Sequence, residues 1–155
     1  EGGLFSGKET ERKSILRLIA EYNPFLLDVE FNAIQKDKKL VSYLKKSKCK
    51  LLISWHDFKK TPSDSHLKTK FNKMKKFSDV IKIVTVAKNV SDVSRLLSLY
   101  SIKSKNKTIA FCMGEQGKFS RILCLHLGSP FTYVSLGKAI APGQFSVDEI
   151  KSLSN

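Results

Sequence analysis

A lysine interrupts one of the most apolar stretches of the sequence. Lys82 lies within DVIKIVTVA, residues 79–87, and both of its neighbours are isoleucines. Such a β-branched run predicts a strand that is buried on both faces. Because removing an ammonium group from water is costly, buried lysines are rare. Either the Lys82 head reaches solvent at the strand end, or desolvation keeps the amine partly neutral so that it can attack a carbonyl and form a Schiff base.

Other reactive side chains stand at the ends of apolar runs. His56 lies in SWHDF, near the end of the second apolar run, and Met113 ends TIAFCM. Arg121 lies in GEQGKFSR, and Gln144 lies in an APGQ turn. Taken singly, these residues need no function: His56 could be a structural histidine at a strand end, Arg121 a surface arginine, and APGQ an ordinary turn. Taken with Lys82, they predict one chemistry, because a histidine transfers protons near neutrality and an arginine binds a carboxylate in bidentate fashion.

Five short apolar runs predict the strands that would position these residues. They are rich in β-branched and aromatic residues and are bounded by polar segments; they cover residues 25–31, 50–58, 79–87, 108–113 and 131–136. Stretches with helical spacing of apolar residues precede, separate and follow them, at residues 8–22, 36–46, 61–77, 90–100, 117–128 and 146–153. Ser91 is predicted to be an N-cap, Gly128 a C′ residue, and Ser146 with Glu149 a capping box.

This alternation of strand and helix indicates a parallel α/β sheet. The sheet would be either doubly wound or part of a (β/α)8 barrel. No G-x-G-x-x-G follows the first predicted strand, which disfavours dinucleotide binding. Five βα units are too few for a closed barrel, which takes about 250 residues. No linker or low-complexity segment divides the chain, so we expect a single domain over residues 1–155.

The chain is strongly basic, with 28 lysines and arginines against 14 acidic residues and a net charge of +14. Much of this charge lies in QKDKKLVSYLKKSKCK and HLKTKFNKMKKFSD, where lysines and apolar residues alternate at the spacing of amphipathic helices with solvated lysine faces. The sequence has no RNP, zinc-finger or basic-zipper pattern, which disfavours specific nucleic-acid binding. Steering of an anionic substrate is a simpler use of the same field.

Cysteine and histidine spacing gives no sign of a metal site. Cys49, Cys112 and Cys124 form no C-x-x-C pair, so we expect reduced, buried thiols in a cytoplasmic protein. No run of about 18 apolar residues predicts a membrane span. The first residues, EGGLFSGKETERK, lack the apolar region of a signal peptide. Since the sequence begins with glutamate, we expect a processed, truncated or partial chain.

The motifs SWHDF, VIKIVTVA, MGEQGKFSR and APGQFSV, in this order, resemble those of type I 3-dehydroquinate dehydratase. EGG at residues 1–3 and LLDVEF at residues 26–31 fit too, so that the resemblance spans about residues 1–153. It implies a TIM-barrel lyase of the shikimate pathway of aromatic amino acid biosynthesis, cytoplasmic, commonly homodimeric and without metal or organic cofactor. The chain would begin just after the third barrel strand, which makes it a partial barrel of about five βα units.

The resemblance also implies catalytic roles. Lys82 matches the lysine that forms an imine with the C3 ketone of 3-dehydroquinate. His56 matches the general base and acid that removes the C2 proton and then protonates the departing C1 hydroxyl, which yields 3-dehydroshikimate and water. Glu1 matches a glutamate that orients this histidine.

Three residues match substrate-binding positions of the family. Arg121 matches the arginine that holds the substrate carboxylate, Gln144 a residue of a closing loop, and Met113 a pocket residue. Ile140 stands before APGQ where the family often has serine or threonine, which removes a hydroxyl that could contact substrate.

Two alternatives remain beside this interpretation. One is another Schiff-base barrel of the aldolase kind, against which the HDF and APGQ positions argue. The other is an inactive fragment or a basic protein that binds nucleic acid.

The resemblance also implies which binding groups this chain lacks. The glutamate and arginines that bind substrate hydroxyls in relatives would lie in the first three strands.

Overall fold

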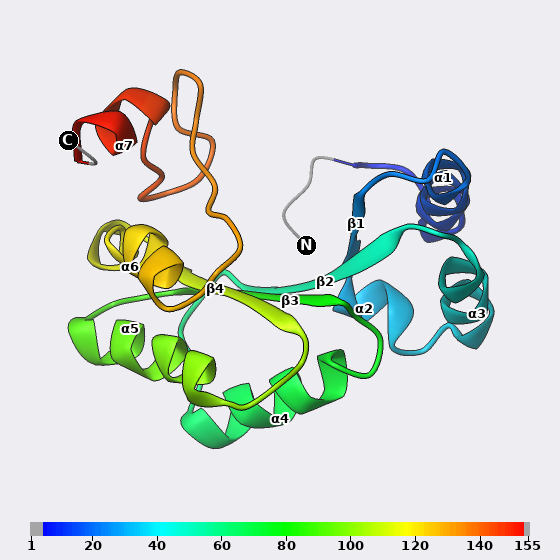
Figure 1. Ribbon diagram of the computed structural model, residues 1–155, viewed down its shortest axis with the longest axis horizontal. Coiled ribbons are helices and arrows are strands. Elements are labelled where there is room, and N and C mark those ends of the chain that lie inside the picture. Colours follow the sequence, from blue (N-terminus) through cyan, green and yellow to red (C-terminus); the bar gives the residue numbers. More distant parts are fainter. Residues whose placement is uncertain (1–4, 154–155) are drawn as a thin grey trace.

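The described chain forms a parallel sheet with helices between successive strands (Figure 1). The computed structural model describes residues 5–153. The strands are β1 (Leu26–Glu30), β2 (Lys50–Asp57), β3 (Val80–Val86) and β4 (Lys107–Met113). They lie in the order β1-β2-β3-β4, and each pairs in parallel with the next. Sequential parallel neighbours joined by helices are the arrangement of successive βα units in a barrel.

Seven α-helices and two 3-10 turns are described around the strands. They are α1 (Glu9–Glu21), α2 (Phe31–Ile34), α3 (Lys38–Lys46), α4 (Asp64–Met74), α5 (Val90–Leu97), η1 (Ser98–Ser101), η2 (Glu115–Gly117), α6 (Ser120–His126) and α7 (Val147–Leu153). In Figure 1, α4 and α5 lie on one side of the sheet, and the C-terminal segment with α7 rises on the other. None of the helices within residues 5–153 is long and apolar enough to cross a membrane.

Local sequence signals set most of the helix ends. The capping box at α7 is confirmed: Ser146 N–H donates to the Glu149 carboxylate at 2.7 Å, and Glu149 N–H donates to Ser146 Oγ at 3.1 Å. Gly128 follows α6 with a φ of +100°, which a C′ glycine adopts without strain. The predicted cap at Ser91 is wrong. The helix already begins at Val90, and its N-cap is Asn89, whose side-chain oxygen accepts the backbone N–H of Asp92 at 2.9 Å.

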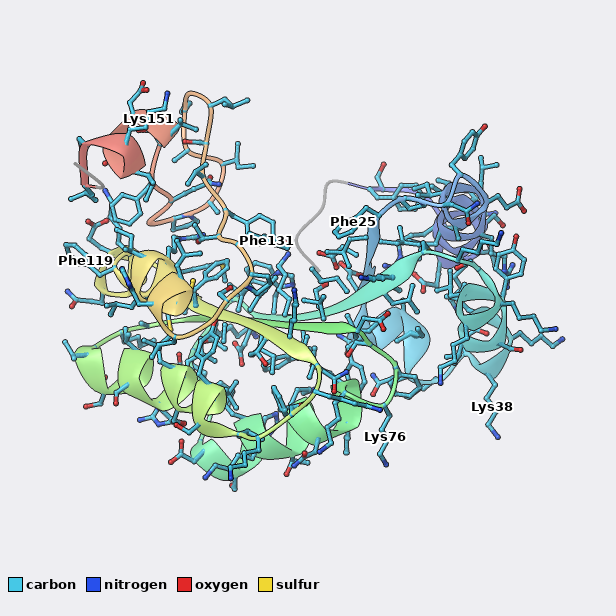
Figure 2. All side chains as sticks on the ribbon, viewed as in Figure 1. Phe25, Lys38, Lys76, Phe119, Phe131 and Lys151 are labelled. Atoms are coloured by element: carbon cyan, nitrogen blue, oxygen red, sulfur yellow. The ribbon has the colours of Figure 1, made fainter. Side chains whose placement is uncertain are left out.

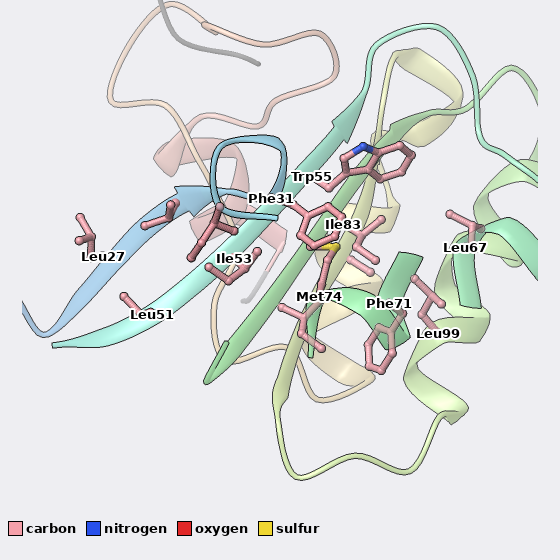
Figure 3. Packing of buried hydrophobic residues seen from close by; sticks show 14 of the residues in the cluster. Leu27, Phe31, Leu51, Ile53, Trp55, Leu67, Phe71, Met74, Ile83 and Leu99 are labelled. Atoms are coloured by element: carbon pink, nitrogen blue, oxygen red, sulfur yellow. The ribbon is translucent and has the colours of Figure 1, made fainter. Parts of the chain in front are cut away.

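The main core lies between the sheet and the helices on one side of it. Ile53 and Trp55 of β2 and Ile83 of β3 pack in one cluster with Phe71 and Met74 of α4 (Figure 3). Burial of each such side chain contributes about 1.5–3 kcal/mol. Because side chains alternate along a strand, these residues commit every second position of β2 and β3 to the helices.

The alternate positions point to the other face of the sheet, where polar side chains stand among apolar ones. Lys82 stands between Ile81 and Ile83, which both belong to the helix-side core, so its side chain leaves the sheet on the opposite side. In the register it is paired with Ser54 of β2. Asp28 of β1 lies on this same face, since its neighbours Leu27 and Val29 also belong to the helix-side core. The face away from α4 and α5 therefore carries these polar side chains beside a second apolar cluster, which includes Leu52, Val84 and Phe111.

The fifth predicted strand, residues 131–136, is not a strand in the structure. Within the described residues this segment forms only an isolated bridge between Ser135 and Ser146. Ser135 N–H donates to the carbonyl of Phe145 at 2.9 Å, so its hydrogen bonding goes to the C-terminal segment and not to β4. The aromatic residues that predicted a strand pack through their rings instead: Tyr133 contacts Phe111 and Phe131.

Candidate active site

One cavity brings together all the predicted site residues that lie in the described chain. It has a volume of about 200 Å³ and is lined by His56, Lys82, Met113, Arg121 and Gln144, with further residues around them. His56 and Met113 lie at the C-terminal ends of their strands, where parallel α/β proteins place their ligands. A neighbouring hollow of about 360 Å³ on the β1 side shares His56 and Lys82.

Glu1 is the one predicted site residue outside the described residues. Its predicted role in orienting His56 stays a prediction.

The amine of Lys82 is enclosed, and its neighbours hold it in a defined position. Only 9% of the residue is exposed. Its Nζ lies 3.1 Å from Oδ2 of Asp28 and 4.4 Å from the centre of the Tyr133 ring. Burial raises the pKa of the Tyr133 phenol, an effect that the positive charge of Lys82 partly opposes. A nucleophilic lysine needs this combination of a fixed position and limited contact with water.

His56 lies on the same face of the sheet as Lys82, on the adjacent strand. It is paired in register with Val84, two residues beyond Lys82, and it is half-buried. Its ring stacks on Phe58, with 5.6 Å between ring centres and an interplanar angle of 12°. The Phe58 ring limits the rotation of the imidazole. A group that transfers protons needs such a fixed orientation.

Arg121 is a buried cation without a carboxylate partner in residues 5–153. It is 2% exposed, its Nη2 donates to the carbonyl of Pro142 at 3.4 Å, and its Cζ lies 4.5 Å from the centre of the Phe111 ring. Its Nε has no hydrogen-bond partner in the described chain. Burial lowers the pKa of this guanidinium. Since buried polar groups are nearly always paired, this vacant donor is unusual and is available to an acceptor group in the cavity.

A serine fixes the start of the helix that carries Arg121. The hydroxyl of Ser120 accepts the backbone N–H of Cys112 at 2.7 Å and donates to the carbonyl of Gly117 at 2.5 Å. Ser120 is fully buried. The pair of hydrogen bonds ties α6 to the end of β4, so that Arg121 enters the cavity from a rigid element.

The APGQ loop closes the cavity by lying directly on the turn after β4. Gly143 has a φ of +69°, and a Cβ at this position would lie 2.5 Å from the carbonyl oxygen of Gly114. Only glycine permits both the backbone angle and the approach. Oε1 of Gln144 accepts the N–H of Ile140 at 3.0 Å, so the glutamine also stabilises its own loop. Ile140 lines the cavity although 90% of it is exposed.

Sequence reasoning missed several residues that define the cavity. Asp28 and Tyr133, which contact Lys82, and Phe58 and Phe111, which contact His56 and Arg121, were not predicted as site residues. One signal was available for Asp28, because an acidic residue between two apolar ones in a strand indicates a polar inner face. The aromatic residues look in sequence like ordinary strand residues.

The described residues contain no group of three or more histidine, cysteine, aspartate or glutamate side chains that could hold a metal ion. Cys49, Cys112 and Cys124 are all buried and free, and burial raises the thiol pKa of Cys112 and Cys124. Raised pKa values disfavour the reactive thiolate.

Comparison with known proteins gives a consistent result. The family model for type I 3-dehydroquinase matches residues 1–155. A 3-dehydroquinate dehydratase of Pyrobaculum aerophilum is 41% identical over 150 residues, which are 96% of this chain and 48% of the relative. A 3-dehydroquinate dehydratase of Methanocaldococcus jannaschii is 37% identical over 156 residues, 99% of this chain and 70% of the relative. The chain thus spans from about half to about two thirds of the length of these relatives.

Solved structures agree with the fold. The type I 3-dehydroquinate dehydratase of Clostridium difficile, crystallised with covalently modified comenic acid, superposes with a TM-score of 0.85 at 26% identity, over 99% of this chain and 63% of that one. The 3-dehydroquinate dehydratase of Geobacillus kaustophilus superposes with a TM-score of 0.88 at 23% identity, over 99% and 62% of the two chains. With a family match over the whole sequence and the fold to accompany it, the chain belongs to the type I 3-dehydroquinases.

Proposed function

We propose that this chain carries the Schiff-base site of a 3-dehydroquinate dehydratase, a lyase that converts 3-dehydroquinate to 3-dehydroshikimate and water. One observation supports it most. An enclosed amine, an imidazole and a buried guanidinium that has no carboxylate partner among residues 5–153 line one small cavity. These groups match a substrate that has both a ketone and a carboxylate.

Lys82 supplies the covalent step. Its neutral amine attacks the C3 carbonyl, and loss of the carbonyl oxygen as water gives an imine. The imine withdraws electrons, so the C2 proton becomes acidic enough for an imidazole to remove it. His56 takes that proton and an enamine forms. The enamine then expels the C1 hydroxyl, which leaves as water with the proton from His56, and hydrolysis of the product imine restores Lys82.

The other cavity residues bind and position. Arg121 holds the substrate carboxylate with its guanidinium, whose Nε has no acceptor among residues 5–153. Met113 and the Gln144 loop enclose the ring. Asp28 and Tyr133 hold the Lys82 head at the cavity wall. Glu1 orients His56.

We further propose that the parent enzyme acts in the cytoplasm as a homodimer. Three buried free thiols are compatible with a reducing compartment. Analytical ultracentrifugation of the purified protein tests the dimer directly.

The function is tested by incubating the protein with 3-dehydroquinate and following the ultraviolet absorbance of the conjugated product. We expect turnover that the Lys82→Met variant lacks and that His56→Ala slows severely. The matched control is Lys107→Met, which removes an exposed lysine at the opposite end of the adjacent strand. Equal turnover by Lys82→Met and the parent would contradict the proposal.

A further inference from the structure

A second cavity, of about 690 Å³, lies at the other end of the strands from the active site. Its walls are the segments that lead into β2, β3 and β4, residues 44–51, 75–79 and 105–106. Lys82, His56 and Met113 lie farther along the same strands. The two cavities share no lining residue.

Six lysines line this second cavity, and we refer to it as the lysine cavity. They are Lys45, Lys48, Lys50, Lys75, Lys76 and Lys105. All six are exposed, and they come from three separate connections between helix and strand. Figure 2 shows Lys76 extending from the edge of the fold.

The charge of these lysines is not neutralised within the described chain. No carboxylate of residues 5–153 lies within 4.0 Å of any of the six ammonium groups. Asp79 is the only acidic residue in the described cavity wall. One of its carboxylate oxygens accepts the backbone N–H of Leu51 at 2.9 Å, so this acid stabilises the start of β2.

Helix ends explain only part of the cluster. Lys45 lies in the last turn of α3, and Lys75 is the C-cap of α4, where a cation interacts favourably with the helix dipole. Lys48, Lys50 and Lys105 lie outside any helix. Like charges around one hollow repel one another, and they create a positive potential that concentrates anions.

The polar groups beside the lysines are already engaged. Ser47 Oγ donates to the carbonyl of Leu44 at 2.6 Å, Ser78 Oγ donates to that of Met74 at 3.1 Å, and the Asn106 amide donates to the carbonyl of Ser78. Recognition in this cavity therefore rests on the number of charges and not on a hydrogen-bonding pattern. Lysine binds phosphate as a point charge without demanding one orientation.

We propose that the lysine cavity binds a linear chain of phosphate groups, either inorganic tripolyphosphate or the triphosphate of a nucleotide. Several phosphates in a row bring several negative charges to a hollow whose lysines stand on three connections. A single phosphate reaches fewer of them. The nucleoside adds little, because the serine and asparagine side chains of the wall already bind backbone carbonyl groups.

The test is isothermal titration calorimetry of the protein with tripolyphosphate, ATP and orthophosphate. The variant Lys48→Gln/Lys76→Gln/Lys105→Gln removes one charge from each connection. The control Lys36→Gln/Lys38→Gln/Lys68→Gln removes three exposed charges outside the cavity, so both variants have the same net charge. Figure 2 shows Lys38 on α3, pointing outward.

We expect one tripolyphosphate per chain and weakening of about tenfold or more in the cavity variant, against less than about twofold in the control. ATP should bind within about threefold of tripolyphosphate, and orthophosphate about tenfold more weakly or worse. Borohydride trapping at Lys82 should be the same in the cavity variant, which separates this proposal from the proposed dehydratase function.

Four results would overturn the proposal. They are absence of tripolyphosphate binding, equal weakening in both triple variants, loss of binding in Arg121→Gln but not in the cavity variant, and binding of ATP without tripolyphosphate. The second would show a response to net charge alone, as would binding of an RNA oligonucleotide that both variants weaken equally. The third would place the anion in the active site.

Discussion

We expect Arg121 to contribute to ligand binding and little to the stability of the fold, and Arg121→Met separates these two contributions. Methionine keeps the packing of the long stem but removes the guanidinium. Within residues 5–153 the guanidinium makes one long hydrogen bond, of 3.4 Å, and its Nε has no partner. Removing a buried unsatisfied donor returns about 1–3 kcal/mol, while the lost contact with the Phe111 ring costs up to about 2 kcal/mol.

These two contributions nearly cancel. We therefore expect the free energy of unfolding, measured by urea denaturation, to change by less than about 1 kcal/mol, whereas breaking a buried ion pair typically costs about 3–5 kcal/mol. The concentration of 3-dehydroquinate that gives half-maximal borohydride trapping should rise about 30-fold or more, because a charge-assisted contact worth at least about 2 kcal/mol is lost.

Ser120→Ala is the matched control on the adjacent residue. It leaves the buried N–H of Cys112 without its acceptor, which costs about 1–3 kcal/mol of stability. A fall in stability larger for Arg121→Met than for Ser120→Ala, with trapping unchanged, would refute the reasoning and make Arg121 a structural residue.

Three more changes have defined outcomes. Gly143→Ala forces a side chain against Gly114 at a positive φ, so we expect a loss of about 1–3 kcal/mol in urea denaturation and weaker substrate binding; unchanged binding would show that the loop is dispensable. Asn89→Ala removes the cap of α5 and should cost about 1 kcal/mol in the same assay, and a neutral result would dismiss the cap. Burial raises the pKa of Tyr100 to about 12. Because the unfolded phenol loses its proton from about pH 10, stability should fall between pH 10 and 12 and fall less in Tyr100→Phe; equal slopes would contradict the assignment.

Periodicity was sufficient to predict the central strands and their order. The apolar runs at β2, β3 and β4 are short and rich in β-branched or aromatic residues, and their ends placed His56 and Met113 at one edge of the sheet. The segment 131–136 has the same composition and is not a strand, because composition cannot show whether a neighbouring strand offers hydrogen bonds. The short helix α2, directly after β1, gave no signal either, since four residues are too few for a helical period.

The site was predictable in its reactive groups but not in their surroundings. Lysine in a strand, histidine at a strand end and arginine at a helix start have chemistry that the sequence shows directly. Asp28 lies 54 residues before Lys82 in sequence. Such contacts depend on strand register and on the path of the C-terminal segment, which no local pattern encodes. That Arg121 Nε finds no partner in the described part of the chain likewise follows only from the packed structure.

The most direct measurement for the central claim is borohydride reduction of the protein with and without 3-dehydroquinate, read by intact mass and peptide mapping. The account predicts a substrate-dependent adduct on the peptide that contains Lys82, still formed by His56→Ala and absent from Lys82→Met. An adduct confined to other lysines, or turnover while Lys82 stays unmodified, would contradict it.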